Sequence, residues 1–508
     1  MWRKYKRLGA FVGKEIYKML STTEIKSLIN NDINSEKKKF ARIGQKYYEA
    51  KHDILKYRMF YYNADGKLVE DTMRSNIKIS HPFFKELSDQ LSSYMLSFNE
   101  NPIRARENIE GASKLQGYLD TYFDEDFWYE IDEVITGTYN KGFEYLYAYK
   151  NIQDRLTFQC ADSLGVVEVR EQDTDDGCKY MIYHYPDRID KGKKVINRIQ
   201  VWTEKETYYY VQVGNGAVKE DTSIKINPRP HVVYTDEKTG EKMGYPLGYI
   251  PFWRLDNNKK QVSGLKPIKG LIDDYDLHAC SLSNNLKDFD TPLHVVKGFD
   301  GDNFDELQTN LKTKKMVGVD EGGGIDVQTI DIPYQARKEK LDIDEKNIYR
   351  FGMGLNTLGL KDTSATTNIA IKAAYSLLEL KANKLEKRLK KLLKEIIKIV
   401  LAEINQVNNT DYQLSDITFK FEHNIMVNET ENIANEKIKA ETKQLEVNTV
   451  LNAAANIGDE QTLKALCEVL DLDYEELKDQ IEKIKEEQNT ADAKATLQDV
   501  VVEEPVVE

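Results

Sequence analysis

The chain has 508 residues and a formal net charge of −13, since 85 Asp and Glu residues outnumber 72 Lys and Arg. This balance excludes a simple basic coat for nucleic acid, which needs excess cations to neutralise phosphates. With 40% apolar and 31% charged residues the chain is predicted to fold, and its length suits several domains. The four cysteines lie far apart, so neither a zinc cluster nor a disulfide framework is predicted, and a reducing compartment fits best. No apolar run approaches the ~18 residues of a membrane span, and no membrane association is predicted.

Charge is unevenly distributed along the chain. Residues 1–60 hold 15 Lys and Arg against 6 Asp and Glu, whereas residues 471–508 hold 4 against 13. The two ends therefore have opposite electrostatic character. The final segment, 491–508, has the composition of a disordered acidic tail.

The first part of the chain is predicted to be helical. Ser21 followed by Glu24 is typical of a capping box at a helix start. Four apolar residues then recur at helical spacing before the helix breaker Asn101-Pro102. These four residues are Phe84, Leu87, Leu91 and Met95.

From about residue 142 the apolar period changes from helical to alternating. Phe143, Tyr145, Tyr147 and Tyr149 alternate strictly, which places the four rings on one face of a strand. A packed sheet face is the simpler interpretation of this row than a platform for stacking bases. Further strands follow, with Asn215-Gly216 as a turn, and together they predict an antiparallel sheet within a mixed α+β region. The predicted strands are 166–170, 181–185, 198–202 and 208–213.

Two helices of similar length bracket a small module in the next part of the chain. The first begins near Pro267 and carries one apolar stripe to Phe289. The second runs from Tyr334 to Phe351 and is ended by Gly352 and Gly354. This arrangement predicts an antiparallel stalk that carries a knob. The knob should contain strands at 293–296, 315–319 and 325–330, a helix at 304–311, and a turn at Gly322–Gly324.

A loop over residues 353–368 follows the stalk and carries Leu355, Leu358 and Leu360 beside Lys361. Loops rarely expose leucines without a partner, so these residues either meet something outside the chain or pack under the next helix. That helix contains no Gly or Pro from Asn368 to Asn405 and would be roughly 55 Å long. Its apolar stripe faces inward and its lysines, Lys381 among them, are expected to face outward. A strand at 417–423 and acidic helices complete the chain.

No constellation of residues indicates catalysis. The sequence has no G-x-x-x-x-G-K-[ST], G-x-G-x-x-G or G-x-S-x-G motif, and its seven histidines never occur at metal-ligand spacing. Asp273, Asp274 and Asp276 could be imagined as a metal site, but an acidic group on a helix is usually a solvated face. The sequence therefore predicts no enzyme activity, no cofactor and no metal. On this evidence alone the chain is an elongated, oligomeric α+β protein.

The order of these pieces resembles the portal proteins of tailed bacteriophages, in the branch typified by the portal of phage SPP1. The likeness extends over about residues 40 to 490. It rests on RSNIKISHPFFKELSDQLSSYMLSFNENPI (74–103), YNKGFEYLYAY (139–149), IPFWRLDNNKKQVSGLKPIKGLIDDYDLHACSLSNNLKDF (250–289) and SATTNIAIKAAYSLLELKANKLEKRLKKLL (364–393).

The resemblance implies a subunit of a dodecameric ring at one vertex of the capsid, through which double-stranded DNA is packaged and ejected. Implied partners are the terminase large subunit, the major capsid and scaffolding proteins and a head-completion adaptor, within a virion assembled in the host cytoplasm. The implied parts are a wing (1–264), stem helix 1 (265–290), a clip (291–333), stem helix 2 (334–352), a tunnel loop (353–368), a long wing/crown helix (369–410), a crown (411–490) and the acidic tail (491–508).

Site residues follow from this assignment as expectations. Acidic stem residues would repel DNA and keep it centred, while a few basic residues would make transient phosphate contacts. The acidic stem residues are Asp273, Asp274, Asp276 and Asp288, and the phosphate contacts are Arg337 and Lys340. The tunnel loop would present Leu355, Leu358, Leu360, Lys361 and Thr363, and the clip would bind partners through Phe304, Leu307, Lys312 and Lys315.

Two alternatives from other classes remain open at this point. One is a cytosolic scaffold built from long helices, without a ring or a DNA channel. The other is a nucleic-acid enzyme whose acidic cluster binds Mg²⁺.

Overall fold

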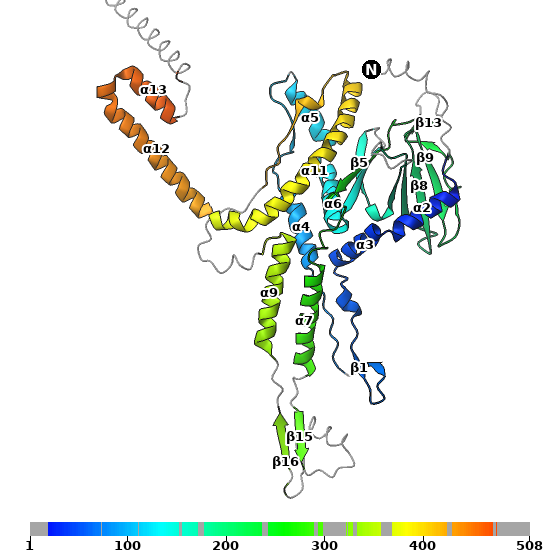
Figure 1. Ribbon diagram of the computed structural model, residues 1–508. Coiled ribbons are helices and arrows are strands. Elements are labelled where there is room, and N and C mark those ends of the chain that lie inside the picture. Colours follow the sequence, from blue (N-terminus) through cyan, green and yellow to red (C-terminus); the bar gives the residue numbers. More distant parts are fainter. Residues whose placement is uncertain are drawn as a thin grey trace, which may run out of the picture. The chain divides into compact units, whose positions relative to one another are not determined.

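The computed structural model describes residues 19–72, 74–109, 111–151, 155–170, 177–235, 242–288, 293–297, 322, 324–328, 333–356, 368–423, 429–470 and 474. The chain divides into two units, one comprising residues 1–359 and 374–425 and the other comprising residues 360–373 and 426–508. Helices and antiparallel sheets are mixed along the chain (Figure 1), which confirms the predicted α+β class.

Two short helices open the described chain. In α2 (Thr22–Asn34) the predicted capping box is present, because the Ser21 hydroxyl accepts from the Glu24 amide and the Glu24 carboxylate accepts from the Ser21 amide. The next helix, α3 (Glu36–Tyr48), is capped by Ser35. The apolar side chains Ile25 and Ile29 of α2 are buried against the larger sheet, so this helix covers one face of it.

The larger sheet is antiparallel and contains the four strands predicted in its sequence region. Its order is β10-β9-β8-β7-β6, with β11 paired to β9. Its core includes Val167, Ile182, Ile199 and Val201. The strands are β6 (Val166–Val169), β7 (Tyr180–Ile189), β8 (Lys194–Trp202), β9 (Glu206–Gln212), β10 (Val218–Glu220) and β11 (Arg229–Pro230).

A second sheet has the order β14-β4-β5, formed by β14 (Phe252–Asp256), β4 (Phe143–Lys150) and β5 (Leu156–Ala161). The aromatic row of β4 packs as predicted over three of its four rings, since Phe143 and Tyr145 are buried and Tyr147 lies beside them. The fourth ring, Tyr149, is exposed. The opposite face of β4 contributes Leu146 and Ala148 to the main core. Both faces of this strand are thus buried, which the alternating pattern alone did not reveal.

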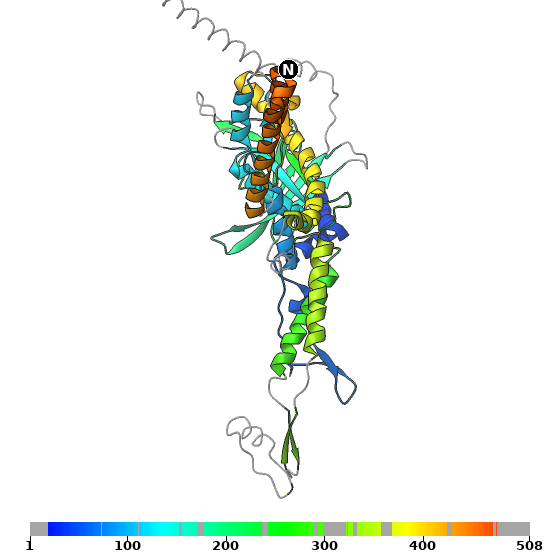
Figure 2. The ribbon, with the colours of Figure 1, turned by 90° about the vertical axis from the view of Figure 1, so that its left-hand side faces the viewer.

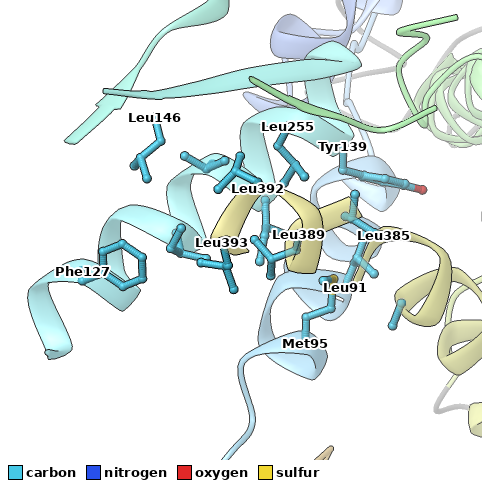
Figure 3. Close-up of a cluster of buried hydrophobic side chains, with 14 of the residues drawn as sticks. Leu91, Met95, Phe127, Tyr139, Leu146, Leu255, Leu385, Leu389, Leu392 and Leu393 are labelled. Carbon is cyan, nitrogen blue, oxygen red and sulfur yellow. The ribbon is translucent and has the colours of Figure 1, made fainter. Parts of the chain in front are cut away.

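The main core lies where the long helix crosses the N-terminal helices (Figure 3). Its helices are α4 (Phe83–Met95), α5 (Ala112–Tyr122), α6 (Glu125–Lys141) and α11 (Asn368–Asn408). The helical stripe predicted before Asn101 is fully inside this core. The apolar stripe predicted for one side of α11 is buried as well, and it comprises Leu385, Leu389, Leu392, Leu393, Ile396, Val400 and Ile404.

The predicted stalk is present as two antiparallel helices, α7 (Lys269–Asp288) and α9 (Tyr334–Gly352), which lie side by side in both views (Figures 1 and 2). Shorter elements complete this unit. They are η1 (Asp53–Lys56), β1 (Phe60–Tyr62), β2 (Leu68–Glu70), η2 (Ser163–Gly165), β12 (Val232–Thr235), β13 (Lys242–Tyr245), β15 (Leu293–Lys297), β16 (Gly324–Gln328), η4 (Leu414–Asp416), and the pair β3 (Ile103–Ala105) with β17 (Ile417–Phe419).

The second unit contains the helices α12 (Glu429–Ile457) and α13 (Asp459–Leu470), which pack against each other. The acidic tail at 491–508 and the knob elements predicted at 304–311 and 315–319 lie outside the described residues.

Candidate functional site

The two helices of the stalk, α7 and α9, which we call the stem, are held together by polar contacts as well as by apolar packing. Lys340 of α9 pairs with Asp274 of α7 and with Asp344 of its own helix. One turn nearer the start of α9, the Nη1 and Nη2 atoms of Arg337 lie 2.9 and 2.7 Å from the Asn285 side-chain oxygen, with the amide oriented to accept. The two residues expected to contact phosphate therefore both bind α7 within the chain. The hydrogen bond from Lys340 also lowers the pKa of Asp274.

Asp276 does not lie on a solvated face, and the expectation that it does is wrong. Its side chain is fully buried and is shared by two histidines. Oδ2 lies 2.6 Å from Nδ1 of His52, and Oδ1 lies 2.7 Å from Nδ1 of His81. Oδ1 also accepts from the His81 amide at 2.9 Å. Burial by itself would raise the pKa of Asp276, but the hydrogen bonds from His52 and His81 outweigh it and lower that pKa.

An extended segment, residues 75–81, runs along α7 and is bonded to it once per helical turn. The amides of residues 81, 79, 77 and 75 donate in turn to the side chains of residues 276, 280, 284 and 288. Two residues of an extended chain advance about 6.6 Å, and four residues of a helix advance about 6.0 Å. Because these two distances are similar, every second amide of the segment meets every fourth residue of α7 over three helical turns. We call residues 75–81 the strap. The bonds to the strap occupy Asp276 and Asp288, two of the four residues expected to face DNA.

The remaining acidic stem residue, Asp273, also has partners. Its carboxylate accepts from the Tyr47 hydroxyl and from Nζ of Lys269, the latter at 2.7 Å. Lys269 in turn bonds Asp53 of η1 at 2.7 Å. All four acidic residues of α7 thus bind groups of this chain. Charge counting along a helix could not find this, because most of the partners come from other elements, as with Tyr47, His52 and Ser75, each more than 200 positions earlier.

The last residue of α9 and the residues that follow it pack against α4 through two glycines. Met353 adopts a left-handed conformation with φ of 53°, and Gly352 and Gly354 on either side lie against Leu87. Leu355 is 8% exposed, and Gln90 brackets its backbone: the Leu355 amide donates to Oε1 and its carbonyl accepts from Nε2, both at 2.9 Å. Of the two possibilities for this leucine, burial within the chain is the one observed. Leu358, Leu360, Lys361 and Thr363 lie outside the described residues.

Lys381 of α11 faces inward, contrary to the expectation that it faces solvent. Its Nζ lies 3.0 Å from the carbonyl oxygen of Gly352, the last residue of α9, and 4.7 Å from the centre of the Tyr139 ring. Burial lowers the pKa of Lys381 to about 7. The signal was present in the sequence, because residue 381 lies four positions before Leu385 and therefore on the buried stripe.

Comparison with known proteins decides the family. The family model for "Phage portal protein, SPP1 Gp6-like" matches residues 28–494. The chain belongs to this family of phage portal proteins. The portal protein of Bacillus phage SPP1 is 27% identical over 348 residues, which are 68% of this chain and 66% of that protein. The portal protein of Clostridium phage phiCD119 is 24% identical over 409 residues, covering 76% and 83% of the two chains.

Among solved structures, a chain from the "Neck of empty GTA particle computed with C6 symmetry" has a TM-score of 0.39 and 12% identity. The match covers 76% of this chain and 90% of that one.

Membership confirms the resemblance to portal proteins. The family is one of structural components of phage particles. The described part of this portal protein contains no group of three or more His, Cys, Asp or Glu placed to hold a metal ion. Among its described helices, none has the length and apolar character needed to cross a membrane.

The portal protein also carries a small two-stranded sheet in the region between its stem helices. Strands β15 and β16 pair antiparallel from Leu293 with Gln328 to Lys297 with Gly324. The strand predicted at 293–296 is therefore confirmed, as is the larger part of the one predicted at 325–330. The residues expected to bind partners, Phe304, Leu307, Lys312 and Lys315, lie outside the described residues.

Proposed function

We propose that this chain is the subunit of a dodecameric portal ring at one capsid vertex, which conducts double-stranded DNA during packaging and ejection. The observation that carries the proposal is the family match over residues 28–494. The antiparallel stem helices support it, since they are the part expected to line a channel. The alternative of a cytosolic scaffold without a ring has no comparable support.

The parts of the ring subunit are assigned along the chain. We assign the wing to residues 1–264, the stem to 265–290 and 334–352, the clip to 291–333 and the tunnel loop to 353–368. The long helix, over about 369–410, would join wing and crown. We place the start of the crown near residue 426 instead of 411, because β17 pairs with β3 and belongs to the first unit.

The contacts within the stem suggest how such a channel avoids holding DNA. Each neutralised phosphate strengthens binding through counterion release, so free cations along a channel would slow sliding. Lys340 and Arg337 bind Asp274 and Asn285, and these contacts leave them less available to phosphates. The acidic residues Asp273, Asp276 and Asp288 contribute mainly to holding the stem, and repulsion of DNA would come from other groups.

DNA would be contacted chiefly by the tunnel loop, through Lys361, Thr363, Leu358 and Leu360. We expect Lys361→Ala to leave ring assembly intact and to alter packaging or DNA retention. Lys384→Ala, an exposed lysine of α11, is the matched control. Unchanged length and retention of packaged DNA in the Lys361 variant would contradict this role.

The clip would present its surface to the terminase large subunit during packaging and then to a head-completion adaptor. Deletion of residues 304–315 should abolish terminase capture in a pull-down while rings still form. Capture at the wild-type level by the deletion variant would refute the assignment. Contacts with the major capsid and scaffolding proteins would involve the wing.

Electron microscopy of the purified chain tests the function as a whole. Class averages should show rings with a central hole and about twelve subunits. Particles without a hole would instead support the long-helix scaffold. A nuclease assay of the wild type and of Asp273→Asn tests the alternative of a nucleic-acid enzyme whose acidic cluster binds Mg²⁺. We expect no nuclease activity in the wild type or in the variant.

A further inference from the structure

The β1–β2 hairpin exposes an apolar face on both of its strands. Tyr62 pairs with Leu68 and Phe60 pairs with Glu70, so the side chains of these four residues share one face. Phe60 is 52% exposed, Tyr62 73% and Leu68 58%. Every residue of the two strands is exposed. A two-stranded hairpin is marginally stable alone in water, and a face of this kind usually meets a partner.

The base of the hairpin is fixed to one level of the stem. After β2 the chain enters the strap, whose first amide, at Ser75, donates to both carboxylate oxygens of Asp288 at 3.1 and 3.2 Å. Asp288 is the last residue of α7. Both views show the hairpin projecting sideways near this end of α7 (Figures 1 and 2). The hairpin therefore lies at the height where α7 ends and α9 begins.

Two large apolar residues are exposed on the stem at the same height. Leu286, in the last turn of α7, is 51% exposed, and Tyr334, the first residue of α9, is 53% exposed. The contact between Asn285 and Arg337 shows that these two helix ends are neighbours. The chain thus carries two distinct exposed apolar surfaces at one level, one on the hairpin and one on the stem.

We propose that the hairpin of one copy packs on the stem of the next copy, with Phe60, Tyr62 and Leu68 covering Leu286 and Tyr334. This inference rests on the proposed function, because a ring closed by rotation needs two different surfaces that meet head to tail. Rotation about an axis along the stem preserves height, so a hairpin at the end of α7 meets the neighbour's stem at that level. Burial of both apolar surfaces then stabilises the ring.

The contact is tested by placing a charge on each of the two surfaces, first separately and then together with opposite signs. Leu68→Glu and Leu286→Lys should each raise the subunit concentration for half-assembly by about ten-fold or more, measured by mass photometry, because each places a charge in an apolar contact. The double variant should recover most of that loss, since the two new charges are opposite and adjacent. Val195→Glu, at a 54% exposed residue of β8, is the control and should assemble as the wild type does.

A cross-linking experiment tests the same contact through the proximity of two residues and does not depend on the affinity between subunits. Tyr62→Cys with Tyr334→Cys, treated with a short bismaleimide, should give a ladder of covalent oligomers, whereas Val195→Cys with Tyr334→Cys should not. The contact is overturned if the single charge variants assemble like Val195→Glu, if the double variant gains nothing, or if no ladder forms. Wild-type chain that forms no ring would overturn the proposed function instead, so the two failures are distinguishable.

Discussion

The Nδ1 atom of His52 lies 2.6 Å from Oδ2 of Asp276, and neither side chain has any exposed surface. The other ring nitrogen of His52 lies 3.3 Å from the carbonyl oxygen of Tyr47, and the rings of Tyr47 and His52 stack with centroids 4.4 Å apart. This contact joins the end of α3 to the stem helix α7. It makes Asp276 the polar centre of the joint between the stem and the rest of its unit.

Replacing Asp276 should therefore weaken the fold more than replacing an acidic neighbour. We expect Asp276→Asn to lower the free energy of unfolding by about 3 kcal/mol, because it removes a buried carboxylate that is hydrogen-bonded to both His52 and His81. Asp274→Asn, whose side chain is 40% exposed, should cost about 1 kcal/mol or less. Urea unfolding of the two variants at neutral pH measures the difference, and equal losses would contradict the central role of Asp276.

The same residue sets a pH dependence with a definite sign. The pKa of Asp276 is lowered in the folded chain from its ordinary value of 3.8, so the unfolded chain binds its proton more readily. Its contribution is complete above pH 3.8 and is lost as the pH falls further. The stability difference between the wild type and Asp276→Asn should accordingly be constant from pH 5 to 7 and shrink below pH 4. If the stability difference between the wild type and Asp276→Asn already disappeared near pH 6, titration of Asp276 would not be its cause.

The strap should detach locally when one of its bonds to α7 is removed. Asn284 accepts from the Ile77 amide at 2.6 Å, whereas its neighbour Asn285 faces Arg337. Loss of one such bond costs about 1 kcal/mol, which corresponds to roughly five-fold faster opening. Hydrogen exchange of the peptide spanning the strap should accelerate by that factor in Asn284→Ala and stay unchanged in Asn285→Ala. Equal exchange in both variants would mean that the bond to Asn284 contributes little.

Because of Lys381, the chain should become more stable as the pH rises above about 7. Burial lowers its folded pKa to about 7, below the 10.5 of an exposed lysine, so the unfolded chain binds the extra proton between these values. Lys381→Met should therefore raise the melting temperature at pH 6, by about 2–5 °C, and the gain should diminish toward pH 9. Lys384→Met is the exposed control on the same helix. A gain independent of pH would show that packing, not charge, is responsible.

Gly354 should not tolerate a side chain. A Cβ built there would overlap Cδ2 of Leu87 and lie 3.0 Å from Oε1 of Gln90, the side chain that brackets Leu355. Gly354→Ala should destabilise the chain by about 1–3 kcal/mol through overpacking. Gly270→Ala, where nothing lies within 4 Å, should instead stabilise α7 by about 0.5 kcal/mol. Calorimetry of the two variants checks the opposite signs.

The candidate site could be predicted only in outline. The helices that form the stem were predicted within two residues at most of their described ends, because their starts and stops depend on local signals such as Gly352. Asp273, Asp274 and Asp276 were read as one solvated acidic face, yet each of them binds different partners. The strap supplies Ser75 to Asp288 and His81 to Asp276, and it has no periodic pattern of its own. The other partner of Asp276, His52, comes from the chain between α3 and η1.

Many of the helices and strands, and the resemblance to phage portal proteins, could be predicted from local sequence patterns. Apolar periodicity predicted the stripe of α11 and the strands β4, β6, β7, β8 and β9, because a buried face requires the same residue types wherever it packs. The burial of particular polar groups could not be predicted in this way, because the pairing of His52 with Asp276, and of Lys381 with the end of α9, joins residues from distant parts of the chain. The excess of acidic residues excluded a simple coat for nucleic acid. Along the stem, the acidic residues of α7 bind other groups of the same chain.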